Sequence, residues 1–414
     1  MNQGAALDDL SKVVDDRVRI AGSDDSIDGV QPSYVATPSS TEETAELLRA
    51  AAHHGLHVVA KGSGTKQDWG NPPDRVDLVI DTTAMTGVVE HAAGDLITVV
   101  RAGTTMTELQ SALALADQQF ALDAPIRSAT VGGTVATNTS GPRRVLYGTL
   151  RDLLIGITFV RADGVVAKAG GKVVKNVAGY DFGKLLTGSY GTLGVITEVA
   201  LRCHPLPMTQ RVVTIEVPDG EVAAQAALRV LGSQVVPSAV EVNQPADGPV
   251  TVVVLLEGVE AGVGARADAT QELLGATSEI GHLFDSFAQY PFGSGDLDLK
   301  ITTTLSGVGP ILSVARGQGV HHGVPISVRG SAAGVLYAAM PADTVPAAAA
   351  QVLAELRAVA AAYDGTVVVL TGPVETRRAL DVWGPISGLD LMRRLKDQLD
   401  PEHRLAPGRF VGGI

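Results

Sequence analysis

The chain has 414 residues, of which 45% are hydrophobic, 19% are charged and 4% are aromatic, and its formal net charge is -13. This composition is typical of a globular protein with two or three domains, and the negative charge disfavours nucleic acid or an anionic membrane surface as a direct partner. Cys203 is the single cysteine, which excludes an internal disulfide and a cysteine-ligated metal or iron–sulfur site within this chain.

The beginning of the chain predicts where the protein resides. Residues 1–30 form an acidic lead without a long apolar core, so we expect no secretory signal peptide. No stretch of about 18 uncharged apolar residues follows, and we expect no transmembrane helix. We therefore predict a cytoplasmic protein, for which partners are the one route to a membrane.

The first half of the chain alternates helical and extended patterns. A short helix is expected near residues 7–18. In the next helix, which ends at Gly55, both Ser39 and Ser40 precede a glutamate by three positions, the spacing of a capping box. Strand patterns and one further amphipathic helix follow; the strands are at 56–62, 76–82 and 96–103, and the helix is at 104–119. This alternation predicts an α+β or α/β domain.

The pattern changes after CHPLP, whose two prolines mark a domain boundary near residue 206. The segments beyond it read strand, helix, strand, strand, helix, and they cover 211–217, 221–232, 237–243, 250–258 and 260–275. This order predicts an antiparallel sheet with helices on one face. Residues 284–335 are rich in glycine and ambiguous, and a strong helix at 342–363 precedes the strand TVVVL.

Five glycine-rich segments lie in order between residues 61 and 197. They are KGSGTK (61–66), TVGGTVATNTSG (130–141), YGTLRD (147–152), KNVAGYD (175–181) and GSYGTLGVIT (188–197). Glycine lets a backbone approach a ligand closely, and successive N–H groups in such turns bind phosphate. Taken singly, each segment reads equally well as a strand-to-loop turn, a buried glycine turn or a hairpin. Together they predict one long phosphate-bearing ligand held by several loops.

Other nucleotide and catalytic motifs are absent. RGQGVHHG (316–323) comes near a dinucleotide fingerprint, but a strand pattern follows it where that fold needs a helix. Gly183-Lys184 is followed by Leu185, where a P-loop needs Ser or Thr, and no G-x-S-x-G elbow occurs. The histidines of HHGLH (53–57) and His321-His322 are interpreted as structural, so no metal site is predicted.

The order and wording of the glycine segments resemble the FAD-binding domain of the vanillyl-alcohol oxidase type, also called the PCMH type. The resemblance covers residues 30–206. GGKVVKNVAGYDFGKLLTGSYGTLGVITEVALRCHPLP looks like the smaller FAD-binding subunit of bacterial three-component glycolate oxidase, and the ending LKDQLDPEHRLAPGRF is similar to the closing element of that family.

The resemblance implies an α+β fold in which two α+β subdomains of a PCMH-type domain hold FAD and an antiparallel-sheet cap with helices on one face follows. The implied boundaries are 1–30 for the lead, 31–206 for the FAD-binding domain, 207–385 for the cap and 386–414 for a C-terminal segment that returns to the FAD-binding domain. The cofactor-binding residues that it implies are Lys61, Gly62, Ser63, Gly64, Thr65, Lys66, Pro125, Thr130, Gly132, Gly133, Thr137, Asn138, Gly141, Tyr147, Gly148, Thr149, Asp152, Gly191, Gly194, Val195 and Ile196.

Three departures from the family pattern affect the expected function. Thr65-Lys66 stands where some relatives carry a histidine that attaches FAD covalently, so we expect noncovalent FAD. The H-x-G-D-G-N and E-H-G strings of relatives that oxidise D-lactate or D-2-hydroxyglutarate do not occur in this chain. The closing N-P-G reads Ala406-Pro407-Gly408, which removes an asparagine side chain at the flavin.

The resemblance implies an FAD-binding oxidoreductase subunit of a glycolate oxidase-like complex. Such a complex oxidises glycolate or D-lactate to the 2-oxo acid, and its partners are a larger FAD-binding catalytic subunit and an iron–sulfur subunit. A stand-alone flavin dehydrogenase of a small 2-hydroxy acid or alcohol is one alternative, and a non-catalytic assembly subunit is another. No catalytic residue is fixed: Arg316 and Arg329 are candidates for binding a carboxylate and His321 and His322 for a base, but a surface or structural role is favoured for all four.

Overall fold

The computed structural model describes residues 3–171 and 179–414, and they form two compact units. Unit 1 comprises Met1–Thr139, Thr149–Leu206 and Ile386–Ile414, and unit 2 comprises Ser140–Gly148 and Pro207–Pro385. The two ends of the chain therefore belong to the same unit. No helix in the described residues is long and apolar enough to cross a bilayer.

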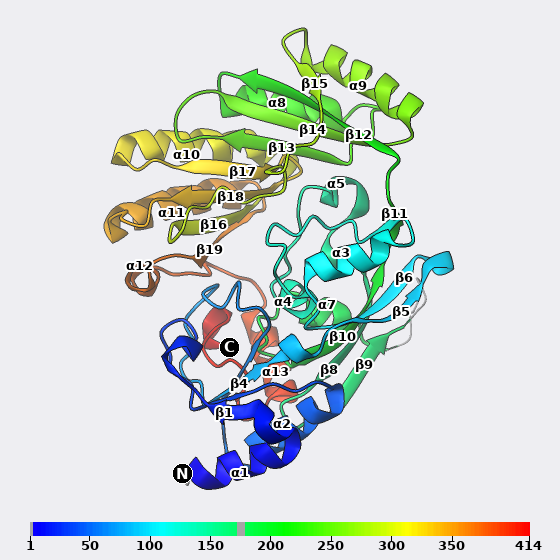
Figure 1. Ribbon diagram of the computed structural model, residues 1–414. Coiled ribbons are helices and arrows are strands. Elements are labelled where there is room, and N and C mark those ends of the chain that lie inside the picture. The colour runs from blue at the N-terminus through cyan, green and yellow to red at the C-terminus, as the bar shows by residue number, and fades with distance from the viewer. Residues whose placement is uncertain (1–2, 172–178) are drawn as a thin grey trace. The chain divides into compact units, whose positions relative to one another are not determined.

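Unit 1 contains a four-stranded and a five-stranded sheet, which Figure 1 shows in blue and in cyan to green. The strands of the first sheet, in the order β1-β2-β4-β3, are β1 (Val18–Ile20), β2 (Tyr34–Ala36), β4 (Leu78–Asp81) and β3 (Val58–Lys61). The strands of the second, in the order β5-β6-β10-β8-β9, are β5 (Val88–Ala92), β6 (Ile97–Arg101), β10 (Val195–Arg202), β8 (Leu154–Val160) and β9 (Val166–Gly170). A short pair joins β7 (Gln118–Gln119) to β11 (His204–Pro205).

The two larger sheets of unit 1 differ in strand direction. In the first sheet β2 and β3 both run parallel to the central β4, while the edge strand β1 is antiparallel. In the second sheet every neighbouring pair is antiparallel. Parallel strands need a long crossover connection. The helix of residues 41–53 supplies it between β2 and β3, and the loop of residues 62–77 supplies it between β3 and β4.

The helices of unit 1 cover these sheets. They are α1 (Gln3–Val14), α2 (Thr41–His53), α3 (Met106–Ala114), α4 (Val131–Ala136), α6 (Leu150–Leu153), α7 (Phe182–Leu186) and α13 (Leu389–Leu399). Short 3-10 turns lie at Asp15–Arg17, Ser23–Asp25, Thr82–Ala84, Ala93–Asp95 and Val411–Gly413. Leu10 of α1 and Leu47 and Leu48 of α2 pack on Leu78 and Ile80 of the first sheet, and this cluster is one core of the unit.

The start of α2 resolves the ambiguity between two candidate caps. The hydroxyl of Ser40 accepts a hydrogen bond from the backbone N–H of Glu43, so Ser40 is the N-cap. The carboxylate of Glu43 in turn accepts from the backbone N–H and the hydroxyl of Ser39. Both serines therefore stabilise the helix start, each through a different atom of the same turn.

Unit 2 is built on one eight-stranded sheet in which every neighbouring pair of strands is antiparallel. Its strands, in sheet order, are β15 (Glu279–Gly281), β12 (Thr209–Val217), β14 (Val250–Gly258), β13 (Ala239–Gln244), β17 (Ser327–Ser331), β18 (Val335–Met340), β16 (Leu297–Thr302) and β19 (Thr366–Thr371). Its helices are α5 (Arg144–Tyr147), α8 (Gly220–Leu231), α9 (Glu260–Leu274), α10 (Val308–His322), α11 (Pro346–Ala362) and α12 (Val374–Ala379), with a 3-10 turn at Leu305–Gly307. The predicted α+β class and the predicted antiparallel sheet of the cap are confirmed.

The helices α8, α9, α10 and α11 share one apolar core with one face of this sheet (Figure 1). Helix α10 lies in the segment that the sequence left ambiguous, and its glycines explain the ambiguity. A Cβ on Gly309 would overlap the carboxylate of Glu221 and lie 3.2 Å from the Cβ of Ala224, so the glycine lets α10 approach α8 closely. Glycine lowers helix propensity by about 1 kcal/mol relative to alanine, and tertiary packing outweighs that penalty here.

The C-terminal segment is fixed to the rest of unit 1 by a buried ion pair. The ammonium of Lys396 lies 2.7 Å from the carboxylate of Asp400, and both side chains are fully buried. Lys396 also donates to the carbonyl oxygens of Thr192 and Leu405, and Asp400 accepts from the N–H groups of Arg404 and Leu405. Each charge is thus satisfied by hydrogen bonds, the condition under which a buried pair is tolerated.

Replacing Lys396 by methionine is expected to destabilise unit 1 strongly, because it leaves the carboxylate of Asp400 buried without a cation. The expected loss is about 3–5 kcal/mol in the free energy of unfolding. Arg393→Met, on the same helix, removes a solvent-exposed pair with Asp390 and should cost less than about 1 kcal/mol. Urea unfolding followed by the fluorescence of Trp69, in a Trp383→Phe background, measures both. Equal losses in the two variants would contradict this account.

Candidate functional site

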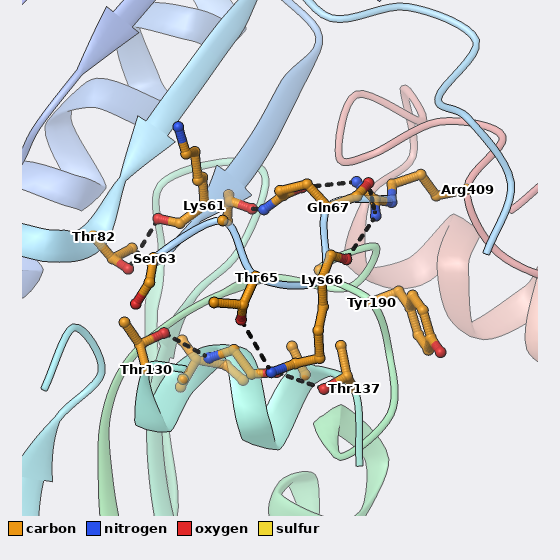
Figure 2. A pocket seen from close by; sticks show the side chains of 18 of the residues that line it. Lys61, Ser63, Thr65, Lys66, Gln67, Thr82, Thr130, Thr137, Tyr190 and Arg409 are labelled. Atoms are coloured by element: carbon orange, nitrogen blue, oxygen red, sulfur yellow. Dashed lines mark hydrogen bonds between the residues drawn. The ribbon is translucent and has the colours of Figure 1, made fainter. Parts of the chain in front are cut away.

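A pocket of about 700 Å³, partly open to solvent, lies in unit 1 where the glycine-rich loops meet (Figure 2). Its walls come from β3 and the loop after it, α4, the loop before β10 and the C-terminal segment. The lining residues are Ala60, Lys61, Gly62, Ser63, Gly64, Thr65, Lys66, Gln67, Thr82, Thr130, Gly132, Gly133, Ala136, Thr137, Tyr190, Gly191, Gly194, Ile196 and Arg409.

The loop of residues 62–67 leaves the end of β3 and forms one wall. Gly64 has a positive φ of 75°, a conformation that favours glycine. Among the described residues, the backbone N–H groups of Ser63, Gly64, Thr65 and Lys66 donate to no protein acceptor. A row of N–H groups left open in a turn is a binding site for an anionic oxygen.

Glycines allow three pieces of backbone to meet at this pocket. A Cβ on Gly62 would overlap the hydroxyl of Thr130, which itself caps α4 by accepting from the N–H of Gly133 at 3.2 Å. A Cβ on Gly132 would lie 2.8 Å from the Cβ of Ala102. Larger residues at Gly62 and Gly132 would therefore push apart the loop after β3, α4 and the chain after β6.

The loop before β10 closes another wall. Tyr190 and Gly191 both adopt positive φ, at 56° and 77°. The N–H of Tyr190 donates to the carbonyl of Ala136 at 2.8 Å, which ties the loop to the end of α4. The ring of Tyr190 lies 5.8 Å from that of Phe410, in a tilted arrangement, so the C-terminal segment also contacts this loop.

Arg409, from the C-terminal segment, holds the loop after β3 through hydrogen bonds to the end of that loop. Its guanidinium donates to the carbonyl oxygens of Gln67 at 2.7 Å and Trp69 at 3.1 Å, and to the side-chain oxygen of Gln67 at 2.9 Å. Arg409 is 3% exposed, yet it lines the pocket. Figure 2 shows it beside Gln67, next to the bend of the loop.

The pocket is strongly asymmetric in charge. Its lining includes the cationic side chains of Lys61, Lys66 and Arg409 and no carboxylate. The Lys66 ammonium has no carboxylate partner among the described residues: the residue is 7% exposed, and its hydrogen bond to the hydroxyl of Thr65 is long, at 3.5 Å. Burial lowers the pKa of Lys66 to about 8. Open N–H groups in a pocket that is lined by cationic side chains and by no carboxylate fit a phosphate-bearing ligand.

Most of the predicted binding residues meet at this pocket. All of the first loop does so, together with Thr130, Gly132, Gly133, Thr137, Gly191, Gly194 and Ile196. The predicted residues that do not line it are Pro125, Asn138, Gly141, Tyr147, Gly148, Thr149, Asp152 and Val195. Gly141, Tyr147 and Gly148 belong to unit 2, and Asp152 accepts hydrogen bonds from the N–H and hydroxyl of Thr149 as the cap of α6. Their role in cofactor binding stays a prediction.

Sequence reasoning did not assign Gln67, Thr82, Tyr190 or Arg409, which also line the pocket. Arg409 lies within the closing element APGR, which was noted only as a likeness to a family. Of the segment KNVAGYD, residues 175–178 lie outside the described residues. Asp181, at its end, caps α7 by accepting from the N–H of Lys184 at 3.0 Å.

The other candidate groups have structural partners in their own units. In unit 2, the guanidinium of Arg316 donates to the carbonyl of Pro245 at 3.3 Å and that of Arg329 to the carbonyl of Phe287 at 2.8 Å. Burial lowers the pKa of Arg329. His321 and His322 stack edge to face, with ring centroids 4.7 Å apart, at the end of α10. A catalytic assignment for these four residues finds no support in these contacts.

The histidines of the HHGLH segment face carboxylates in unit 1. His54 lies 2.9 Å from Asp9, and His57 lies 3.0 Å from Asp77. His53 joins Asp9 and His54 in a group whose ligand atoms all lie within 4.8 Å of one another. Asp9 already pairs with Lys12 at 2.7 Å, and these contacts attach α1 to the end of α2.

Comparison with protein families matches two parts of the chain. Residues 32–170 match the FAD binding domain family, and residues 334–410 match the C-terminal domain of FAD linked oxidases. The loop after β3 and the lining residues of α4 lie within the first match, and Arg409 lies at the end of the second. The lining residues of the loop before β10 and of β10 itself lie in neither match.

Curated relatives and solved structures are similar to this chain to different extents. Glycolate oxidase subunit GlcD of Bacillus subtilis is 30% identical over 58% of this chain and 50% of its own length. D-lactate dehydrogenase of Archaeoglobus fulgidus is 34% identical over 50% of this chain and 46% of its own, and glycolate oxidase subunit GlcE of Escherichia coli is 35% identical over 39% and 46%. The chain thus spans about half the length of the curated relatives it matches.

The likeness to solved structures extends over nearly the whole chain. p-Cresol methylhydroxylase has a TM-score of 0.74 at 15% identity and covers 98% of this chain and 96% of its own. An alkyldihydroxyacetonephosphate synthase has a TM-score of 0.74 at 17% identity and covers 98% and 86%. At these identities the likeness establishes the fold.

Substituting Gly62 by alanine is expected to weaken FAD binding about tenfold or more. The added Cβ displaces Thr130 from its cap on α4, and overpacking of this kind costs about 1–3 kcal/mol. Gly94→Ala is the matched control, because a Cβ there meets nothing within 4 Å. Titration of the deflavinated proteins with FAD, followed by quenching of flavin fluorescence, gives both dissociation constants. Equal affinity in the two variants would contradict the proposed site.

Proposed function

Because this chain belongs to the FAD-binding flavoproteins of the PCMH type, with a FAD-linked oxidase C-terminal domain, we propose that it is the FAD-binding oxidoreductase subunit of a complex that oxidises a small 2-hydroxy acid. Glycolate or D-lactate is the proposed substrate, and the 2-oxo acid is the product. The single observation that carries the proposal is the convergence of the glycine loops on one cationic pocket in unit 1.

The pocket residues fit FAD. The loop after β3 offers backbone N–H groups and the nearby ammonium of Lys66 to a diphosphate. Gly132 and Gly194 also line the pocket, and a Cβ at either position would lie 2.8 Å or less from Ala102 or Phe159, so glycine at both positions keeps this wall packed on the chain behind it. FAD supplies the acceptor for the two electrons that leave an alcohol carbon, and the protein positions and tunes it.

We further propose that the FAD is held noncovalently. Thr65 and Lys66 stand on the first loop where some relatives carry the histidine that attaches FAD. The chain has no histidine between His57 and His91. The hydroxyl of Thr65 already accepts a hydrogen bond from Lys66, and neither side chain is the imidazole that attaches flavin in some relatives.

Missing sequence motifs and the contacts of two arginines favour a role within a complex over independent catalysis. The H-x-G-D-G-N and E-H-G strings of self-sufficient relatives do not occur, and Arg316 and Arg329 of unit 2 are bound to backbone carbonyls. The single buried cysteine cannot ligate an iron–sulfur cluster, so electrons would leave through a cluster on a partner. The named relatives in Bacillus subtilis and Escherichia coli are themselves subunits of glycolate oxidase.

The proposed partners are a larger FAD-binding catalytic subunit and an iron–sulfur subunit. In the balanced reaction the hydroxy acid loses two electrons and two protons, and the electrons pass through flavin to the partner cluster. A stand-alone dehydrogenase and a non-catalytic assembly subunit are the competing functions.

Anaerobic spectroscopy of the purified chain separates these functions. We expect a yellow protein whose flavin stays in the supernatant after acid precipitation and is not bleached by glycolate or D-lactate. When the two partner subunits are added, glycolate should reduce an artificial electron acceptor, whereas acetate, which lacks the hydroxyl, should not.

Two outcomes would overturn the proposal. Bleaching of the single chain by either hydroxy acid would identify a stand-alone dehydrogenase. A protein that neither contains nor takes up flavin would identify an assembly subunit.

A further inference from the structure

Lys66 is a buried amine that the fold leaves without an anionic partner. The residue is 7% exposed, its hydrogen bond to the hydroxyl of Thr65 spans 3.5 Å, and its nitrogen lies 5.9 Å from the centroid of the Trp69 ring. Figure 2 shows the side chain running from the loop toward Thr137, the residue that follows the end of α4. A buried charge is ordinarily paired, so a lysine in this state needs either a ligand or a lost proton.

The charged and titratable groups around Lys66 do not supply a carboxylate. Of the pocket-lining residues, β3 contributes Lys61, the loop before β10 contributes Tyr190, the C-terminal segment contributes Arg409, and α4 contributes no titratable side chain. Asp68 follows two positions later on the same loop but does not line the pocket. Burial is the sole cause of the lowered pKa of Lys66, which is about 8.

The open N–H groups next to Lys66 identify the chemistry of the missing partner. The backbone N–H groups of Ser63, Gly64, Thr65 and Lys66 have no protein acceptor in the described chain, and these residues line the same pocket as the Lys66 side chain. Such an arrangement suits an oxygen anion with several acceptor atoms, and the diphosphate of FAD is the group with that chemistry.

We propose that the protonation state of Lys66 controls the affinity for FAD. The ammonium form of Lys66 binds the FAD diphosphate, and the neutral amine form releases the cofactor. The inference concerns the FAD site of the proposed function but requires neither the substrate nor the partners. The effect is regulatory, because mildly alkaline conditions would convert the free protein into a form that holds FAD weakly.

The sign of the pH effect follows from linkage. In the free protein Lys66 loses its proton near pH 8, and a bound diphosphate raises the pKa of Lys66 by stabilising the ammonium. Below pH 8 both forms carry the proton, so the affinity for FAD does not depend on pH. Above pH 8 the bound form carries a proton that the free form lacks, so affinity falls by up to tenfold for each pH unit.

The test is the dissociation constant of FAD for the deflavinated full-length protein between pH 7 and pH 9.5. The wild type should bind FAD about tenfold more weakly at pH 9 than at pH 7. ADP-ribose, which carries the same kind of diphosphate without a flavin, should compete with the same pH dependence. Calorimetry in two buffers of different ionisation enthalpy should show uptake of up to about one proton per FAD at pH 9.

Variants assign the effect to Lys66. Lys66→Met should bind weakly and without pH dependence, whereas Lys66→Arg, which stays charged, should bind at pH 7 nearly as well as wild type and lose the pH dependence. Lys61→Met is the matched control, since it removes the neighbouring pocket lysine and should keep the wild-type slope.

A flat wild-type profile would overturn the proposal, as would an unchanged slope in Lys66→Met. A slope with FAD that ADP-ribose does not share would also overturn it, because the partner of Lys66 would then lie at the flavin. None of these outcomes depends on whether glycolate is a substrate, so failure here and failure of the proposed function are distinguishable.

Discussion

The ion pair between Lys396 and Asp400 is the contact on which the pocket of unit 1 depends. Lys396 donates to the carbonyl of Thr192, in the loop before β10, and to the carbonyl of Leu405, while Asp400 orders the turn that carries Arg404 and Leu405. That turn places Arg409 behind the loop after β3. One buried pair therefore sets the positions of two loops that are far apart in sequence.

This arrangement accounts for how the loop after β3 can leave its own hydrogen-bonding groups open. The residues between Gly62 and Gln67 form few internal hydrogen bonds, and the guanidinium of Arg409 holds the loop instead through carbonyls at its far end. The N–H groups on the pocket side stay available for a ligand. Because contacts with Arg409 already order this loop, it loses less conformational entropy on binding a ligand than a flexible loop would.

The sequence predicted local elements well where the signal was local. The cap of α2 and the strands that flank the first loop follow from neighbouring residues, and the order of the glycine segments indicated a phosphate-bearing ligand. Helix α10 was missed because Gly309, Gly317 and Gly319 lower its propensity, although Gly309 is what lets it pack on α8. Arg409 and Gln67 are 342 positions apart, and a local sequence pattern cannot predict a contact over that separation.

The central claim is that FAD binds in the pocket formed by the glycine loops of unit 1, and hydrogen exchange of the deflavinated protein with and without FAD tests it most directly. The account predicts that FAD slows exchange in peptides covering 61–67 and 188–196, which contain residues that line the pocket. Protection confined instead to another hollow of unit 1, lined by Gly156, Lys168 and Glu198, or to peptides of unit 2, would contradict it.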